Sequence, residues 1–247
     1  MNRKIKLLTL IIMSMSVYFI YNITKNNTIN IVSLGDFLTE GITSYGIKDY
    51  SYSDYLKLDL ESNSIKINLN KYSNKDMSID KLLTLIKTTP KIKKDLKEAH
   101  ILILNIGYND LLYKLSITED ISIYKLNKII LDIENDYNEL IKEIKKYYDN
   151  KIIVVGYYKT NSNDFYQNRG ISMLNKVLNN ENIIYIDTYN LDKKYFNNPN
   201  SYYPNNYGYL EIAKKIIKKL ENMKNIWYIN NAFELLWRKN SSWRKER

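Results

Sequence analysis

The stretch Gly35-Asp36-Phe37-Leu38-Thr39-Glu40-Gly41 directly follows a short apolar run, Ile29 to Leu34. A continuous apolar run of this length is typical of a strand that is buried on both faces of a parallel sheet. The two glycines that frame the next segment are positions that shape a loop or a helix start. Phe37 stands in the middle of this loop, and its phenyl ring offers no group that can attack a carbonyl.

Further apolar runs, rich in Ile and Val, alternate with longer segments of helical periodicity. Together they predict an α/β domain with a doubly wound, flavodoxin-like sheet of five parallel strands covered by helices on both faces. The expected strands are 29–34, 65–69, 101–106, 151–157 and 182–187. The expected helices are 50–61, 78–88, 120–148, 166–179 and 206–223, of which the long, heavily charged 120–148 is expected to be a solvated outer helix.

The length of 247 residues suits one sizeable domain. The chain has no cysteine, which excludes disulfides, thiolate metal sites and a cysteine nucleophile. Its net charge of +10 is concentrated at the ends, since residues 1–25 and 238–247 each carry four net positive charges and leave two for residues 26–237. A nucleic-acid-binding face on the domain is therefore not expected.

The N-terminal segment, residues 1–25, has basic residues followed by an uncharged apolar run from Leu7 to Ile23. This run is at the lower length limit of a membrane-spanning helix, and the basic flank places the N-terminus inside. We favour an uncleaved signal-anchor with the domain 26–225 outside the cell membrane. The alternative is a cleaved signal peptide and a secreted protein, although no small-x-small cleavage pattern follows the run.

The C-terminal tail, residues 226–247, is basic and contains three tryptophans. Its apolar residues Ile226, Ile229, Phe233, Leu236 and Trp237 follow a helical spacing. Two interpretations stay open: a last helix packed on the domain, or an interfacial helix that contacts the membrane together with the anchor.

Three loops are expected at the carboxyl edge of the sheet, where open α/β sheets place their ligand sites. They are Gly35–Gly41 after the first strand, Gly107-Tyr108-Asn109-Asp110 after the third, and the segment from Asn200 to Tyr209 before the last helix. The topology predicts that these loops, far apart in the sequence, meet in space.

All three loops resemble, in order, sequence blocks of the SGNH/GDSL hydrolases, and the resemblance covers roughly residues 28–222. The first loop is similar to Gly-Asp-Ser-Leu-Thr-x-Gly, with Phe37 in place of the nucleophilic serine. The second is similar to Gly-x-Asn-Asp, which implies that Asn109 is an oxyanion donor. The third is similar to His-Pro-Asn-x-x-Gly-Tyr, with Tyr203 in place of the general base and Asn200 in place of the orienting aspartate. The chain resembles the anchored, single-domain bacterial type of this family.

The resemblance therefore implies the fold of an ester hydrolase without its catalytic triad. In the second sequence block, Asn74 or Lys75 replaces the glycine that also donates to the oxyanion. Tyrosine, with a pKa near 10, is a poor base at neutral pH. The single histidine, His100, precedes the strand 101–106, which places it at the amino edge of the sheet, about 20 Å from Asn109. Catalysis by an intact triad is excluded.

The leading hypothesis is a membrane-anchored, extracytoplasmic pseudo-hydrolase that binds an acyl or glycan ligand or a cell-envelope partner, with no metal and no cofactor. The expected ligand-binding residues are Asp36, Phe37, Tyr108, Asn109 and Tyr203. One alternative is an ester hydrolase of the lipase/acylhydrolase class with a non-standard site, for example one that uses the carboxylates of Asp36 and Asp110. Another is a scaffold protein that binds partners through its outer surface.

Overall fold

The computed structural model describes residues 28–62, 66–160, 164–197 and 202–222. Its elements are β1 (Thr28–Gly35), α2 (Phe37–Glu40), α3 (Tyr52–Ser62), β2 (Lys66–Ser73), α4 (Ile79–Thr88), α5 (Pro90–Glu98), β3 (Ile101–Asn105), α6 (Tyr108–Ser116), α7 (Ile123–Lys145), β4 (Ile152–Val155), α8 (Phe165–Leu178), β5 (Ile183–Ile186), the 3-10 helix η1 (Lys193–Tyr195) and α9 (Asn206–Asn222).

The five strands form one sheet in the order β2-β1-β3-β4-β5, and every neighbouring pair is parallel. This is the strand order of flavodoxin-like folds, so the predicted fold class is confirmed. The strands β3 and β4 are buried along their whole length, because their Ile, Leu and Val side chains contact helices on both sides of the sheet.

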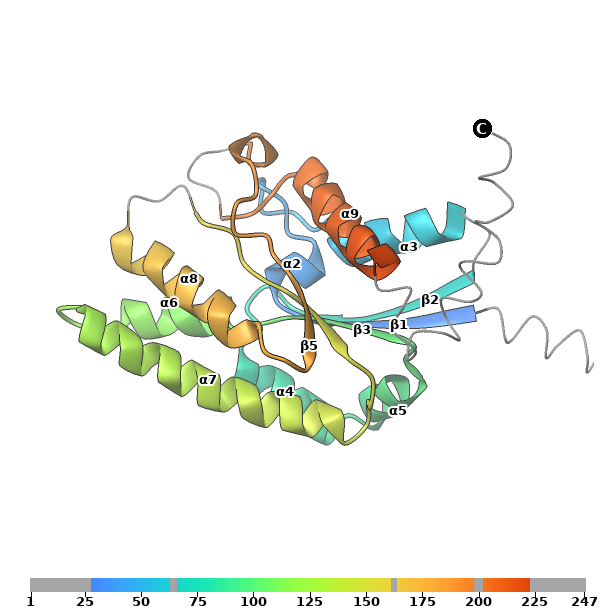
Figure 1. Cartoon of the computed structure of the whole chain (residues 1–247), viewed down its shortest axis with the longest axis horizontal. Helices are drawn as coiled ribbons and strands as arrows, with labels where there is room; N and C mark the ends of the chain where they lie inside the picture. Colours follow the sequence, from blue (N-terminus) through green and yellow to red (C-terminus); the bar gives the residue numbers. More distant parts are fainter. Residues whose placement is uncertain (1–27, 63–65, 161–163, 198–201, 223–247) are drawn as a thin grey trace, which may run out of the picture.

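The helices cover the sheet in two layers. Figure 1 shows α3 and α9 on one face, and α4, α5, α7 and α8 on the other. The right-handed crossovers between parallel strands require this division, since the chain reverses its winding direction after β2. The loops that follow the strands consequently gather at the carboxyl edge of the sheet.

The edge strand β2 is four residues longer at its carboxyl end than the prediction of 65–69. It pairs with β1 over all eight positions, from Thr28 opposite Lys66 to Gly35 opposite Ser73. Its side chains are mostly half-buried or exposed, which explains why an apolar run did not mark its full length. Backbone pairing with β1 thus extends a strand that its own composition does not reveal.

Three short α-helices, α2, α5 and α6, were not among the predicted helices. For α5 the sequence does carry a signal, because Pro90 occupies the first turn, where a missing N–H is tolerated, and Ile92 and Leu96 are buried one turn apart. The helix α7 also differs from its prediction as a solvated outer helix. It is amphipathic, with an apolar stripe packed on α4, α6 and α8 and its charges on the other face.

His100 lies at the amino edge of the sheet, as predicted. Its Nδ1 accepts a hydrogen bond from the backbone N–H of Asn30 at 3.0 Å, and the His100 backbone N–H donates to the Asn30 carbonyl at 2.9 Å. The imidazole therefore joins the first residues of β1 and β3, and partial burial lowers its pKa. This position gives it no access to the loops at the opposite edge.

The predicted anchor 7–23 and the tail 226–247 lie outside the described residues. Within the described ranges, no helix combines the length and the apolar character needed to cross a membrane.

Tyr137 on α7 is fully buried, and its hydroxyl has no hydrogen-bond partner among the described residues. An unsatisfied buried hydroxyl destabilises the folded state by about 1–3 kcal/mol. We therefore expect Tyr137→Phe to raise the free energy of unfolding by about 1 kcal/mol in urea titrations. The matched change Tyr209→Phe should lower it by a similar amount, because the Tyr209 hydroxyl donates to the Ile42 carbonyl at 2.6 Å. A clear loss of stability in Tyr137→Phe would contradict this assignment.

Candidate functional site

The loop that carries Phe37 is a single helical turn held between two glycines. Gly35 ends β1 with φ of +148°, and a Cβ there would stand 2.0 Å from the Asn105 carbonyl oxygen. Asp36 caps the helix α2, since its Oδ1 accepts from the Leu38 N–H at 3.2 Å. Gly41 ends it in the left-handed conformation, with its N–H on the Phe37 carbonyl. The backbone of this turn thus depends on Gly, Asp and Gly, and makes no demand on the side chain at position 37.

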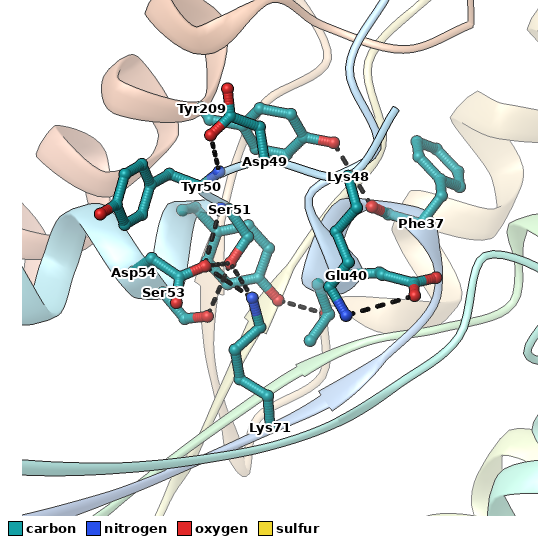
Figure 2. A network of polar contacts seen from close by, with 12 residues as sticks. Phe37, Glu40, Lys48, Asp49, Tyr50, Ser51, Ser53, Asp54, Lys71 and Tyr209 are labelled. Carbon is teal, nitrogen blue, oxygen red and sulfur yellow. Dashed lines mark hydrogen bonds and ion pairs between the residues drawn. The ribbon is translucent and has the colours of Figure 1, made fainter. Parts of the chain in front are cut away.

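The Phe37 carbonyl oxygen also accepts a hydrogen bond from a side chain on α9, the last helix of the domain. The Tyr209 hydroxyl, on α9, donates to this carbonyl at 3.3 Å and to the Ile42 carbonyl at 2.6 Å, and Figure 2 shows the hydroxyl pointing at the Phe37 carbonyl. The segment after α2 is joined to the third loop by the Ser44 hydroxyl, which donates to the Tyr203 carbonyl at 2.6 Å. The first and third loops are therefore in direct contact, as the topology predicts.

The Phe37 ring is 2% exposed and packs against three tyrosines. Its centroid lies 5.1 Å from that of Tyr203 and 5.5 Å from that of Tyr108, both edge to face, and 6.3 Å from that of Tyr157. Tyr108 and Tyr157 are stacked at 5.2 Å. The predicted residues Phe37, Tyr108 and Tyr203 are thus brought together, and Tyr157, which the sequence analysis missed, completes the group. We call Phe37, Tyr108, Tyr157 and Tyr203 the Phe37 cluster.

In the Phe37 cluster the rings lie between the three loops and pack against one another. Tyr108 and Tyr157 are buried like Phe37, whereas Tyr203 is half-buried. The Tyr108 hydroxyl also accepts a hydrogen bond at 3.0 Å from the side-chain amide of Gln167, a buried residue of α8. A ligand can contact Phe37 or Tyr108 only if these rings move apart.

Asp36 is a buried acid directly beneath the Phe37 cluster. Burial raises the pKa of its carboxyl to about 8, and the Tyr157 hydroxyl, which donates to Oδ2, offsets only part of this effect. The carboxyl is therefore mostly protonated at pH 7. A neutral, solvent-excluded acid that caps a helix turn fills a structural role, and its side chain is not accessible to a ligand.

Asn109 and Asp110, on α6, both bind the loop between β2 and α4. The Asn109 amide donates to the carbonyls of Lys75 and Met77, at 2.8 Å each. The Asp110 carboxylate accepts from the Ile79 N–H at 3.1 and 3.2 Å and so caps α4, while burial raises its pKa to about 6. The N–H groups that the family resemblance assigns to an oxyanion are thus engaged with the backbone. Asp36 and Asp110 are not arranged as a catalytic pair, since each caps its own helix.

The second-block position, Asn74 or Lys75, lies in the same loop. The Asn74 N–H donates to the Gly35 carbonyl at 3.3 Å, and its Oδ1 accepts from the Asp76 N–H at 2.9 Å. Lys75 contributes the carbonyl that Asn109 binds. The Asn74 N–H is therefore also occupied, and it holds the loop against the end of β1.

Tyr203 contributes its ring to the Phe37 cluster, and burial raises the pKa of its hydroxyl above the ordinary value. A raised pKa leaves even less of the tyrosinate, the form that could accept a proton, at neutral pH. Asn200 lies outside the described residues, so its position relative to Tyr203 stays a prediction.

One hydroxyl near this region has a lysine beside it. Ser51 Oγ lies 3.0 Å from Lys71 Nζ, and both contact the Asp54 carboxylate, at 2.8 and 2.6 Å (Figure 2). A serine activated by lysine needs an unpaired, neutral amine and access for the substrate. Here the ammonium is paired with Asp54 and Ser51 is fully buried. Ser51, Asp54 and Lys71 are hydrogen-bonded to one another at the start of α3, and Ser51 does not replace the missing nucleophile.

No group of three or more His, Asp or Glu side chains that could hold a metal ion occurs in the described part of the chain.

The parallel sheet and the three loops at its carboxyl edge have the arrangement of an SGNH/GDSL hydrolase-like fold. Neither a protein-family model nor a curated protein sequence matches the chain. Solved structures do, over 77–78% of this chain. A lipase from a goat rumen metagenome matches over 97% of its own length, with a TM-score of 0.66 and 20% identity. An acetylxylan esterase from Geobacillus stearothermophilus matches over 93% (TM-score 0.58, 17% identity), and a lipase/acylhydrolase from Enterococcus faecalis over 96% (0.57, 15%). At these identities the likeness establishes the fold.

The raised pKa of Asp36 predicts a pH dependence of stability. The unfolded chain releases this proton near pH 3.8, whereas the folded chain keeps it up to about pH 8. The free energy of unfolding should therefore fall as the pH rises between these values. Asp36→Asn, which does not titrate, should gain roughly 1–3 kcal/mol over the wild type between pH 5 and pH 8 in urea titrations.

Tyr157→Phe is the companion variant for this prediction. It removes the hydrogen bond that lowers the Asp36 pKa, so the free energy of unfolding should go on falling to a higher pH than in the wild type. Parallel pH profiles for the wild type and Asp36→Asn would show that Asp36 is not the titrating group.

Proposed function

We propose that the protein is a pseudo-hydrolase: an SGNH/GDSL hydrolase-like domain that does not cleave esters and acts by binding an acyl or glycan ligand or a cell-envelope partner. The observation that carries the proposal is the burial of the Phe37 ring at the nucleophile position, inside a cluster of tyrosines. Acyl transfer needs a nucleophile, a base and oxyanion donors. Position 37 offers no nucleophile, position 203 offers a tyrosine, and the Asn109 amide is bound to backbone carbonyls.

The similar acetylxylan esterase supports this assignment of the lost groups. Its catalytic mutants replace a serine, an aspartate or a histidine, and the aspartate precedes the histidine by three positions. Asn200 precedes Tyr203 by the same spacing in this chain. All three positions of a serine triad are thereby replaced by residues of different chemistry.

The alternative is an ester hydrolase with a non-standard site, which the esterases and lipases among the similar structures favour. Such a site would need a nucleophile other than Phe37. Ser51, the hydroxyl with an adjacent lysine, is buried and fully hydrogen-bonded, which argues against it.

The absence of ester hydrolysis can be tested with the full-length protein and p-nitrophenyl acetate. We expect the wild type and Phe37→Ala to hydrolyse the ester at the same rate as buffer. Phe37→Ser should stay inactive as well, because it restores a hydroxyl without a base. The triple variant Phe37→Ser, Asn200→Asp, Tyr203→His is the positive control, and we expect at least about tenfold more activity from it than from Phe37→Ser, since removing base and acid from a triad costs several orders of magnitude.

Two results would contradict this proposal. Turnover by the wild type above that of Phe37→Ala would place a working site at position 37. Equal turnover of the wild type and Phe37→Ala, both well above buffer, would support the alternative of a non-standard site elsewhere in the domain.

We further propose that residues 7–23 anchor the domain on the outer side of the cell membrane, with the tail 226–247 as a second contact. The uncharged apolar run after a basic flank supports this topology. Full-length protein should remain in the membrane fraction after alkaline carbonate washing, whereas protein without residues 1–25 should be released. Deletion of 226–247 from the full-length protein should leave it in the membrane fraction. In protein that lacks residues 1–25, the same deletion should reduce binding to anionic liposomes. Release of the full-length protein by carbonate would exclude a spanning anchor.

A further inference from the structure

A hollow of about 400 Å³ opens beside the start of α8 and shares no residue with the Phe37 cluster. Its walls come from the segment after β4, the segment after β5 and the first two turns of α8. It therefore lies at the carboxyl edge of the sheet, where α/β folds bind ligands, and its size falls within the range of small-molecule sites.

Hydrogen bonds hold the backbone segments around the hollow in place. The Lys159 N–H donates to the Tyr189 carbonyl at 2.9 Å, which ties the two wall segments together. Thr160 is buried, and its N–H and hydroxyl both donate to the Asn168 side chain on α8, at 3.1 and 3.2 Å. These bonds fix the walls before any ligand arrives, so little ordering entropy is lost on binding.

Two cations, Lys159 and Arg169, line the hollow, and both are exposed. Within the described residues, neither has a carboxylate within ion-pair distance. One acid, Asp164, also lines the hollow, but its Oδ1 caps α8 by accepting from the Gln167 N–H at 2.9 Å. The hollow therefore carries net positive charge. An arginine beside a lysine is a favourable arrangement for a phosphate or carboxylate group.

Two aromatic rings also line the hollow. Phe165 is 63% exposed, and Tyr189 is half-buried. Exposure of a phenyl ring gives no stability to the fold, whereas an aromatic face beside hydroxyl and amide groups is suited to the flat side of a sugar ring. Ser172 supplies a hydroxyl in the same hollow.

We propose that this hollow binds an anionic carbohydrate, a sugar phosphate or a uronic acid, with Lys159 and Arg169 on the anion and Phe165 against the sugar ring. This site is separate from the Phe37 cluster and requires no catalysis. The proposal goes beyond the pseudo-hydrolase function, because it holds whether or not the domain cleaves esters.

The test is calorimetric titration of the full-length protein with glucose 1-phosphate, glucuronic acid, inorganic phosphate and glucose at low salt. We expect both anionic sugars to bind with Kd values below about 1 mM, as two charged contacts allow. Inorganic phosphate and glucose should bind at least about tenfold more weakly, because each lacks one half of the recognised chemistry. Binding of the anionic sugars should weaken as salt is added.

Variants on α8 and its loop locate the site. Arg169→Gln and Lys159→Gln should each weaken the binding of glucose 1-phosphate by roughly tenfold, whereas Lys176→Gln, an exposed lysine in the last turn of the same helix, should leave it unchanged. Phe165→Ala should remove the preference for glucose 1-phosphate over phosphate. Thermal unfolding of each variant confirms that it is folded.

Three outcomes would overturn the proposal: no saturable binding of either anionic sugar, equal affinity for inorganic phosphate and glucose 1-phosphate, or equal effects of Arg169→Gln and Lys176→Gln. The ester hydrolysis assay does not enter this readout. Failure of the carbohydrate site is therefore distinguishable from failure of the pseudo-hydrolase proposal.

Discussion

The arrangement of the candidate site depends on the close approach of β1 to β3 at their carboxyl ends. Gly35 pairs with Asn105 on one side and with Ser73 on the other, and there is no room for a side chain at Gly35. Because all three strands end at the same level, the loops that follow them start side by side. Hydrogen bonds to backbone carbonyls then join three segments: the turn of α2, the start of α6 at Asn109, and the loop between β2 and α4.

The phenyl ring at position 37 also determines the state of the acid beneath it. Asp36 lies at the base of the same turn, and the rings of Phe37, Tyr108 and Tyr157 exclude water from it. Loss of water disfavours the carboxylate form and raises the pKa, while the Tyr157 hydroxyl supplies the one side-chain hydrogen bond that the acid receives. The aromatic residue and the neutral acid are thus two consequences of one closed site.

Much of this arrangement could be predicted from the sequence, and physical reasons explain both what was predicted and what was missed. Continuous apolar runs revealed the buried strands β1, β3, β4 and β5, and their alternation with helices gave the parallel sheet. The meeting of Phe37, Tyr108 and Tyr203 followed from that topology. Tyr157 was missed because the prediction placed it inside the strand 151–157, where an aromatic residue has the pattern of an ordinary core side chain, whereas β4 ends at Val155. That the Asn109 amide binds the carbonyls of Lys75 and Met77 could not be predicted either, because a hydrogen-bond partner depends on the path of a loop and not on spacing.

The residues that this chain shares with the hydrolase pattern are those that the fold itself needs. Gly35 and Gly41 fit conformations that a side chain would block, Asp36 and Asp110 cap helices, and Asn109 holds a loop. Positions 37 and 203 carry no such constraint, since the backbone of their loops is fixed by neighbouring groups. Retention of the scaffold therefore follows from folding alone and is not by itself evidence for a ligand. Evidence for binding must come from groups that stability does not require, and the exposed Phe165 ring and the cations Lys159 and Arg169 are groups of that kind.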